Sequence, residues 1–148
     1  MPLDDTTYLH RITIGVNKII NAGKLPHFML LLLSDPEYGV INYFDNDRTK
    51  DIIDLCREWV NTGNKPNKVI WLKTRDAAAY FSTIWGVCHR KTDGEWATGT
   101  SIWALQNIPA MKNNHELRNI IKNIHLDYIN SLLNEDDELF TWEDYEND

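Results

Sequence analysis

Apolar residues at helical spacing between positions 117 and 132 constrain the fold of this chain more than any other feature of its sequence. The apolar positions are Leu117, Ile120, Ile121, Ile124, Tyr128 and Leu132. Residues spaced in this way share one face of a 3.6-residue turn, so the pattern predicts an amphipathic helix. Asn113 followed by Glu116 resembles a capping box at its start, and we expect the helix to end near Asn134.

Three more segments show helical periodicity. Thr6–Ala22 and Arg48–Asn61 carry apolar side chains every three or four positions. We expect Asp47 to cap the second of these helices and Gly63 to end it. A further helix is expected from Arg75 to about Trp85, with apolar side chains over most of its circumference.

The remaining apolar runs are short and bounded by turn residues, which favours strands. The expected strands cover residues 28–33, 38–44, 69–72, 87–91 and 95–103. Asp93-Gly94 between the last two is a dipeptide typical of tight hairpins. The resulting order αββαβαββα predicts an α+β, or mixed α/β, single layered domain.

Acidic residues are concentrated at the C-terminal end of the chain. Nine of the 22 acids follow Lys122, the last basic residue. Residues 1–122 hold 13 acids and 15 bases, so their formal charge is +2, whereas the whole chain carries −7. The composition changes at Glu135, which predicts a nearly neutral globular domain over residues 1–134 and an acidic aromatic tail over 135–148.

We expect this tail to be the surface that binds a partner protein. The residues expected in the contact are Glu135, Asp136, Asp137, Glu138, Phe140, Trp142, Glu143, Asp144 and Tyr145. The carboxylates would steer the tail toward a Lys/Arg-rich groove, and the rings would supply apolar burial. Alternatively, the rings pack back on the domain and the acids confer solubility. The first interpretation predicts a cytoplasmic adaptor or inhibitor that binds a basic, and in one version nucleic-acid-facing, surface of another protein.

In composition, these fourteen residues resemble the acidic C-terminal tails with which bacterial and phage single-stranded-DNA-binding proteins recruit partner enzymes. The resemblance leaves open a second function, direct binding of single-stranded nucleic acid. Such binding requires a basic groove, but the bases of the domain are scattered, and only Arg90-Lys91 and Lys65/Lys68 lie near one another. The rings that could stack on bases are expected in the core instead: Trp71, Trp85, Trp96 and Trp103.

A third possibility is a small hydrolase or transferase with an unfamiliar active site. Its carboxylates would be sought near the expected strand ends, at Asp35, Glu37, Asp45 and Asp76. The common signatures of phosphate-binding loops, dinucleotide folds and nucleophile elbows do not occur, and we expect neither a cofactor nor a metal.

The cysteines and the hydropathy bear on the compartment. Cys56 and Cys88 have no paired spacing, which favours a reducing environment, and we expect Cys56 to be a packing residue. Cys88 and His89 are neighbours in sequence, so their side chains diverge and they cannot serve as a catalytic pair. The longest apolar run, Phe28–Leu33, has six residues, against roughly 20 for a membrane-spanning helix. We expect a cytoplasmic protein without a membrane span.

Overall fold

In the described part of the chain, the segments expected as strands form helices or turns instead. The computed structural model describes residues 3–78 and 92–133, and within these residues there are six α-helices, one short 3-10 helix and no strand. The elements are α1 (Asp5–Asn21), α2 (Leu25–Ser34), η1 (Val40–Asn42), α3 (Asp47–Thr62), α4 (Lys68–Ala77), α5 (Asp93–Lys112) and α6 (Glu116–Leu132). The predicted α+β or mixed α/β class is therefore wrong.

The run Phe28–Leu33, predicted as a strand, forms the centre of α2. An uninterrupted apolar run carries no periodicity, so spacing alone cannot separate a buried strand from a buried helix. Leu and Met favour helices, and Pro26 in the first turn suits a helix start. Phe28, Met29, Leu32 and Leu33 are buried and Leu30 and Leu31 are partly buried, so no side of this apolar run is fully exposed. The next predicted strand, 38–44, contains η1 instead.

Asp93-Gly94, predicted as a hairpin turn, starts α5. The side-chain oxygen of Thr92 accepts a hydrogen bond from the backbone N–H of Glu95 at 3.1 Å, which caps the helix. Asp93 and Glu95 place negative charge in the first turn, where the helix dipole favours it. The predicted strand 95–103 therefore lies within α5, and the predicted strand 87–91 falls outside the described residues.

Three helices were predictable from periodicity. α1 and α3 agree with the expected segments to within about a residue at each end, and Gly63 ends α3 in the left-handed conformation with φ of 74°. The caps differ in detail, because Asn46 rather than Asp47 caps α3. α6 ends at Leu132, two residues before the expected Asn134.

The capping box expected at Asn113 and Glu116 is wrong. Asn113 ends α5 in the left-handed conformation, with φ of 50°. Asn114 takes the capping role, since its Oδ1 accepts hydrogen bonds from the backbone N–H groups of Glu116 and Leu117. α4 runs from Lys68 to Ala77, so it overlaps the helix expected over 75–85 only in residues 75–77. Residues 79–85 of that prediction lie outside the described residues.

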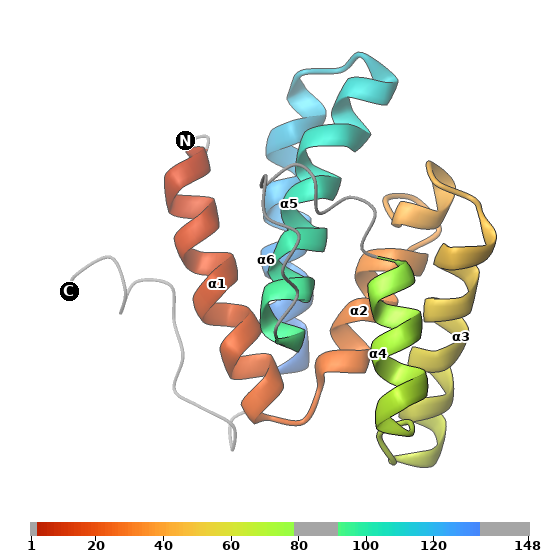
Figure 1. The fold of residues 1–148 in the computed structure, drawn as a ribbon. Coiled ribbons are helices and arrows are strands. Elements are labelled where there is room, and N and C mark those ends of the chain that lie inside the picture. Colours follow the sequence, from red (N-terminus) through yellow and green to blue (C-terminus); the bar gives the residue numbers. More distant parts are fainter. Residues whose placement is uncertain (1–2, 79–91, 134–148) are drawn as a thin grey trace.

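α1, α5 and α6 pack side by side as one group of helices, and α2 connects this group to α3 and α4 (Figure 1). α2 contacts α1, α3 and α6, whereas α4 packs on α3. α2 therefore occupies the middle of the molecule, which explains why its sequence is apolar on nearly every side. None of the helices in residues 3–78 and 92–133 has both the length and the hydropathy that crossing a bilayer requires.

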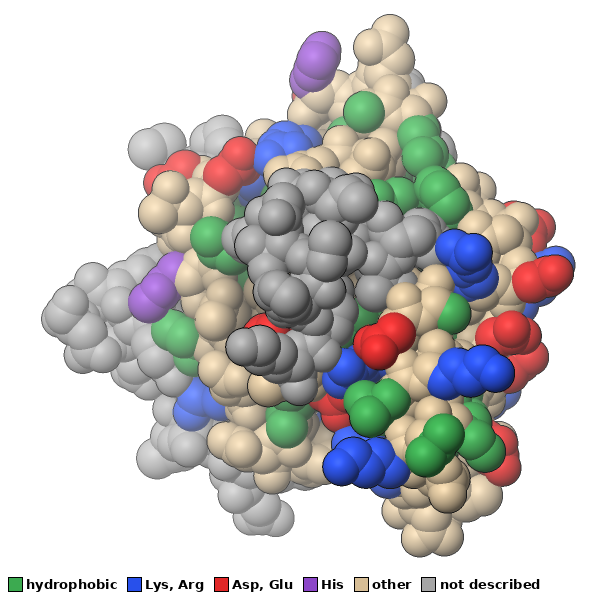
Figure 2. Space-filling model, in the orientation of Figure 1, with side chains coloured by type: hydrophobic (Ala, Val, Ile, Leu, Met, Phe, Trp, Pro, Cys, Tyr) green, Lys and Arg blue, Asp and Glu red, His purple; other side chains and the backbone are tan. Residues whose placement is uncertain are grey.

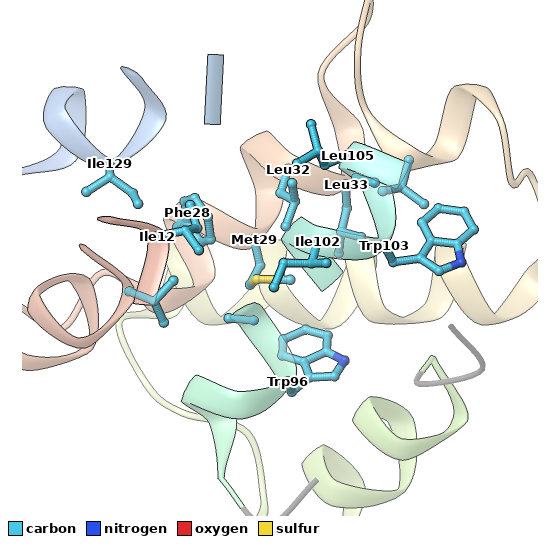
Figure 3. Close-up of a cluster of buried hydrophobic side chains, with 14 of the residues drawn as sticks. Ile12, Phe28, Met29, Leu32, Leu33, Trp96, Ile102, Trp103, Leu105 and Ile129 are labelled. Atoms are coloured by element: carbon cyan, nitrogen blue, oxygen red, sulfur yellow. The ribbon is translucent and has the colours of Figure 1, made fainter. Parts of the chain in front are cut away.

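The core contains side chains of all six helices, and those labelled in Figure 3 come from α1, α2, α5 and α6. Ile12, Phe28 and Ile129 lie in one part of this view and Met29, Ile102 and Trp96 in another. The ring of Trp103 points away from these residues and packs on Phe44, at 5.2 Å between centroids. As predicted, Trp71, Trp96 and Trp103 are buried, and so is Cys56. Trp85 and Cys88 lie outside the described residues.

Pro109 lies inside α5 and leaves one backbone carbonyl of this helix free to accept a hydrogen bond from a neighbouring helix. Proline has no N–H, so the carbonyl four residues earlier, that of Leu105, lacks its usual intrahelical donor. Arg118 of α6 donates its Nη1–H to this carbonyl at 3.2 Å and its Nη2–H to Asp5 of α1 at 2.8 Å. Hydrogen bonds from Arg118 and Lys122 lower the pKa of the Asp5 carboxyl to about 2. One arginine therefore ties α6 to both α5 and α1.

His125 lies in a small buried polar group between α1 and α6. Its Nδ1 shares a hydrogen bond of 2.7 Å with the hydroxyl of Tyr8, and its ring lies against that of Tyr128. Tyr128 in turn donates to the carboxylate of Asp35. Complete burial lowers the pKa of His125 from 6.5 to about 3, so the imidazole is neutral in the folded protein.

We predict that this histidine makes the protein less stable as the pH falls from 7 to 5. The unfolded chain takes up a proton near pH 6.5, but the folded chain does not, so the free energy of unfolding decreases below that pH. Over this window the loss from His125 is about 2 kcal/mol. Urea denaturation at both pH values measures it.

His125→Asn is the variant that tests this prediction, because an amide oxygen can replace Nδ1 as partner of the Tyr8 hydroxyl. Burial and the neighbouring Lys24 also lower the pKa of His27, so His27→Asn serves as the comparison. His125→Asn should remove most of the difference between pH 7 and pH 5, and His27→Asn a smaller part. A wild-type-sized difference in His125→Asn would show that another group is responsible.

Candidate functional site

The outward face of α4 is the best candidate for a functional surface in the described part of the chain. α4 starts where the side chain of Asn67 accepts hydrogen bonds from the backbone N–H groups of Val69 and Ile70, at 2.9 and 3.3 Å. This cap fixes the helical phase of the residues that follow. With that phase, Trp71, Arg75 and Ala78 point inward and are buried. The predicted strand 69–72 thus becomes a helix with one buried side.

The buried side of α4 is held by indole rings in edge-to-face contact. The ring of Trp71 makes edge-to-face contacts with Trp59 of α3, at 5.3 Å between centroids, and with Trp96 of α5, at 5.6 Å. Both interplanar angles are 85°, the geometry in which the positive edge of one ring meets the negative face of the next. These rings place α4 against two neighbouring helices.

Asp93 connects this side of α4 to the first turn of α5. Its Oδ1 accepts hydrogen bonds from Trp71 Nε1 at 2.9 Å and from Arg75 Nη1 at 2.7 Å. Its Oδ2 accepts from Lys65 Nζ, also at 2.9 Å. Partial burial by itself raises the pKa of the Asp93 carboxyl, but the three donors outweigh it and hold the pKa below its ordinary value. The carboxylate therefore remains charged beside the buried Arg75.

Lys65 closes this cluster from the solvent side. Its ammonium lies 5.5 Å from the ring centroid of Trp59 and 5.9 Å from that of Trp71, within the range of a cation–π contact. Lys65 and Arg75 are thus committed to Asp93 and the indole rings. The remaining basic side chains of α4, Lys68 and Lys73, are exposed to solvent.

The opposite side of α4 exposes aliphatic side chains between these lysines. We call Lys68, Val69, Ile70, Lys73 and Ala77 the α4 face; all five are exposed. The exposed fractions of Val69 and Ile70 are 74% and 54%, the two highest among the large hydrophobic residues that the structure describes. Figure 2 shows hydrophobic side chains beside Lys and Arg side chains over α4 and the adjoining part of α3.

An open hollow of about 330 Å³ lies between α3 and α4, next to the α4 face. Its lining residues are Arg48, Asp51, Ile70, Lys73, Thr74 and Ala77. The lining thus contains two cationic side chains, one carboxylate and the aliphatic side chains of Ile70 and Ala77. Such a surface fits an anionic ligand that also carries apolar groups.

A second hollow, of about 320 Å³, lies between α1, α5 and α6. Leu9, Ile102 and Leu105 form its apolar wall. Its charged groups, Asp5 and Arg118, are 2.8 Å apart and form an ion pair with each other. Because these two charges neutralise each other, this hollow attracts a charged ligand less strongly than the α4 face does.

The residues predicted to contact a partner, from Glu135 to Tyr145, all lie outside the described residues. The boundary predicted between residues 134 and 135 also remains a prediction. Three of the four carboxylates considered for an enzyme make local contacts of their own. Asp35 accepts from the backbone N–H of Glu37 and from Tyr128, Asp45 lies 3.3 Å from Lys50, and Asp76 lies 3.3 Å from Arg75.

Residues 3–78 and 92–133 contain no group of three or more His, Cys, Asp or Glu side chains placed to hold a metal ion. No protein-family model, curated protein or solved structure matches this chain.

We predict that Asp93 stabilises the protein more than any exposed acid does. Asp93→Asn removes the charge that faces Arg75, whose exposed fraction is 3%, and leaves a buried guanidinium with a weaker partner. The expected loss is about 3 kcal/mol in the free energy of unfolding, measured by urea denaturation. Asp54→Asn is the control, since Asp54 pairs with Arg57 in solvent and should contribute almost nothing. Equal losses in the two variants would contradict the assignment.

We also predict that the aliphatic side chains of the α4 face do not stabilise the fold. Val69→Ser and Ile70→Ser should each change the free energy of unfolding by less than about 0.5 kcal/mol, because both residues are mainly in contact with water. Ile53 of α3, with an exposed fraction of 5%, is the comparison. Ile53→Ser should cost more than about 2 kcal/mol. A large loss in Val69→Ser would mean that the residue packs within the domain.

Proposed function

We propose that this protein is an adaptor or inhibitor that binds another protein through residues 135–148. One observation carries the proposal. Eight acidic residues and no basic residue occur in these fourteen positions, and Leu139, Phe140, Trp142 and Tyr145 alternate with them. The rest of the chain is nearly neutral, so the anionic character belongs to this segment alone. A segment with both charge and rings can be steered to a partner and then held there.

The proposed partner presents a basic groove, of the kind that in some proteins faces nucleic acid. Carboxylates would approach its Lys and Arg side chains, and the association rate would depend on ionic strength. Phe140 and Trp142 would enter apolar pockets and slow dissociation. The helical domain would act as the rigid body that the segment attaches to the partner, whether to recruit it or to block its groove.

The proposal includes a reducing, intracellular compartment. Cys56 is a free thiol buried in α3. Burial, with a smaller effect from Asp93, raises the pKa of Cys56 to about 12, so the thiol is a packing group and not a nucleophile. A chain that keeps such a thiol unpaired suits the cytoplasm, where thiols stay reduced.

Substitutions in the full-length chain test the proposal without removing any residue. The charge variant is Glu135→Gln, Asp136→Asn, Asp137→Asn and Glu138→Gln together. The ring variant is Phe140→Ser with Trp142→Ser. The control removes the same number of charges from exposed positions outside this hollow, by Asp47→Asn, Asp54→Asn, Glu58→Gln and Asp127→Asn.

Quantitative affinity capture from cells of the source organism identifies the partner, and titration calorimetry with the purified partner measures its affinity. We expect both tail variants to weaken binding by at least about tenfold, and the control to bind as the wild type does. The difference in partner affinity between the wild type and the charge variant should shrink at high salt. Salt screens the attraction of the wild-type carboxylates, which the charge variant does not have. A partner that binds both variants as tightly as the wild type would refute the proposed function.

A further inference from the structure

We infer that the acidic segment 135–148 docks on the α4 face and the adjoining hollow of its own chain when no partner is bound. The inference rests on the proposed function in one respect: the docked segment would be unavailable to the partner until it is released. The α4 face would then act as an internal competitor for the partner's basic groove.

The charges of the two surfaces are complementary. Residues 64–77 contain four bases and one acid, Asp76, which pairs with Arg75, and the segment 135–148 contains eight acids and no base. Lys65 and Arg75 already pair with Asp93, which leaves Lys68 and Lys73 for a ligand. No described residue forms an ion pair with Lys68, Lys73 or the nearby Arg48. Their charges face solvent and can attract the carboxylates of the segment.

The apolar parts also match. Phe140 and Trp142 are two positions apart, so in an extended segment both rings lie on one side. Val69 and Ile70 offer an aliphatic surface to such rings, and the hollow beside them has a volume of about 330 Å³. Aromatic side chains each bury roughly 150–250 Å² when they dock. Docking of these two rings would cover the most exposed aliphatic side chains in the described part of the protein.

The length of the chain permits this contact. α6 ends at Leu132, whose carbonyl accepts a hydrogen bond from Lys24 Nζ at 2.6 Å, and this bond fixes the point where the segment leaves the domain. The ten residues from 133 to Trp142 extend to at most about 35 Å, and a domain of this size has a diameter of roughly 35 Å. An extended segment of this length can therefore span the width of the domain.

Docking within one chain is favoured over docking between two copies. A tethered segment has an effective concentration in the millimolar range, well above the concentration of a second molecule in most solutions. Weak attraction between a few charges and two rings is then enough to occupy the site for much of the time. The same weakness lets a partner with a better groove displace the segment.

Amide chemical shifts of the full-length protein test the inference directly. ¹⁵N–¹H spectra of the wild type are compared with those of the ring variant Phe140→Ser/Trp142→Ser. Besides the mutated segment, we expect shifts in α4 and in the first turns of α3, around Arg48 and Asp51. High salt should move the wild-type spectrum toward that of the variant. Identical α4 shifts in wild type and ring variant would overturn the inference.

A variant of the α4 face provides the reciprocal measurement. Lys68→Glu/Val69→Ser/Lys73→Glu should abolish the effect of the ring substitutions on the α3 amides, because the segment is already released. Ile120→Ser is the matched control, since Ile120 of α6 is also an exposed hydrophobic residue, at 44%. The control should leave the effect intact. Spectra at low and high protein concentration distinguish docking within one chain from docking between two copies. Chemical-shift differences that grow with concentration would indicate docking between copies and would overturn the intramolecular proposal.

Partner affinity separates this inference from the proposed function. If both are correct, the face variant should bind the partner more tightly than the wild type, roughly tenfold, because no competition remains. If the spectra show no contact with α4 while the tail variants still lose the partner, the proposed function stands and the inference fails. If the spectra show the contact while the tail variants retain the partner, the proposed function fails and the inference stands without its regulatory consequence.

Discussion

The carboxylate of Asp93 is the contact on which the position of α4 depends. It sits in the first turn of α5 and accepts hydrogen bonds from an indole, a guanidinium and an ammonium that all come from α4 or the loop before it. α4 has few other connections, since apart from this cluster it packs mainly on α3. One acid at a helix start therefore determines which side of α4 faces inward and which side remains for ligands.

Periodicity in the sequence was sufficient for the helices that have one apolar face and one polar face. α1, α3 and α6 belong to this class, and the expected boundaries were close to the observed ones. Periodicity was insufficient for α2, because Leu30 and Leu31 are apolar although only partly buried, and this removes the spacing that would distinguish a helix from a strand. The hairpin predicted at Asp93-Gly94 was wrong for another reason. This dipeptide suits a hairpin turn, but it also suits the first turn of a helix that Thr92 caps.

The candidate site was only partly accessible to sequence reasoning. The acidic aromatic segment could be recognised because composition alone defines it. The α4 face could not, since Val69–Leu72 reads as a buried strand until Asn67 is known to cap a helix. Lys65 and Lys68 are close in the sequence, but the sequence could not show that Lys65 is bound to Asp93 and that Lys68 is not. That distinction depends on contacts between residues far apart in the chain.

The bond from Arg118 to the carbonyl that Pro109 leaves without a donor has a consequence for the tolerance of the chain to insertions. A backbone carbonyl, unlike a side chain, cannot change rotamer to follow a displaced partner. Adding or deleting one residue in the turn 113–115 would rotate α6 by about 100° and carry the guanidinium away from this acceptor. The length of the turn between α5 and α6 is thus more constrained than the identity of its side chains.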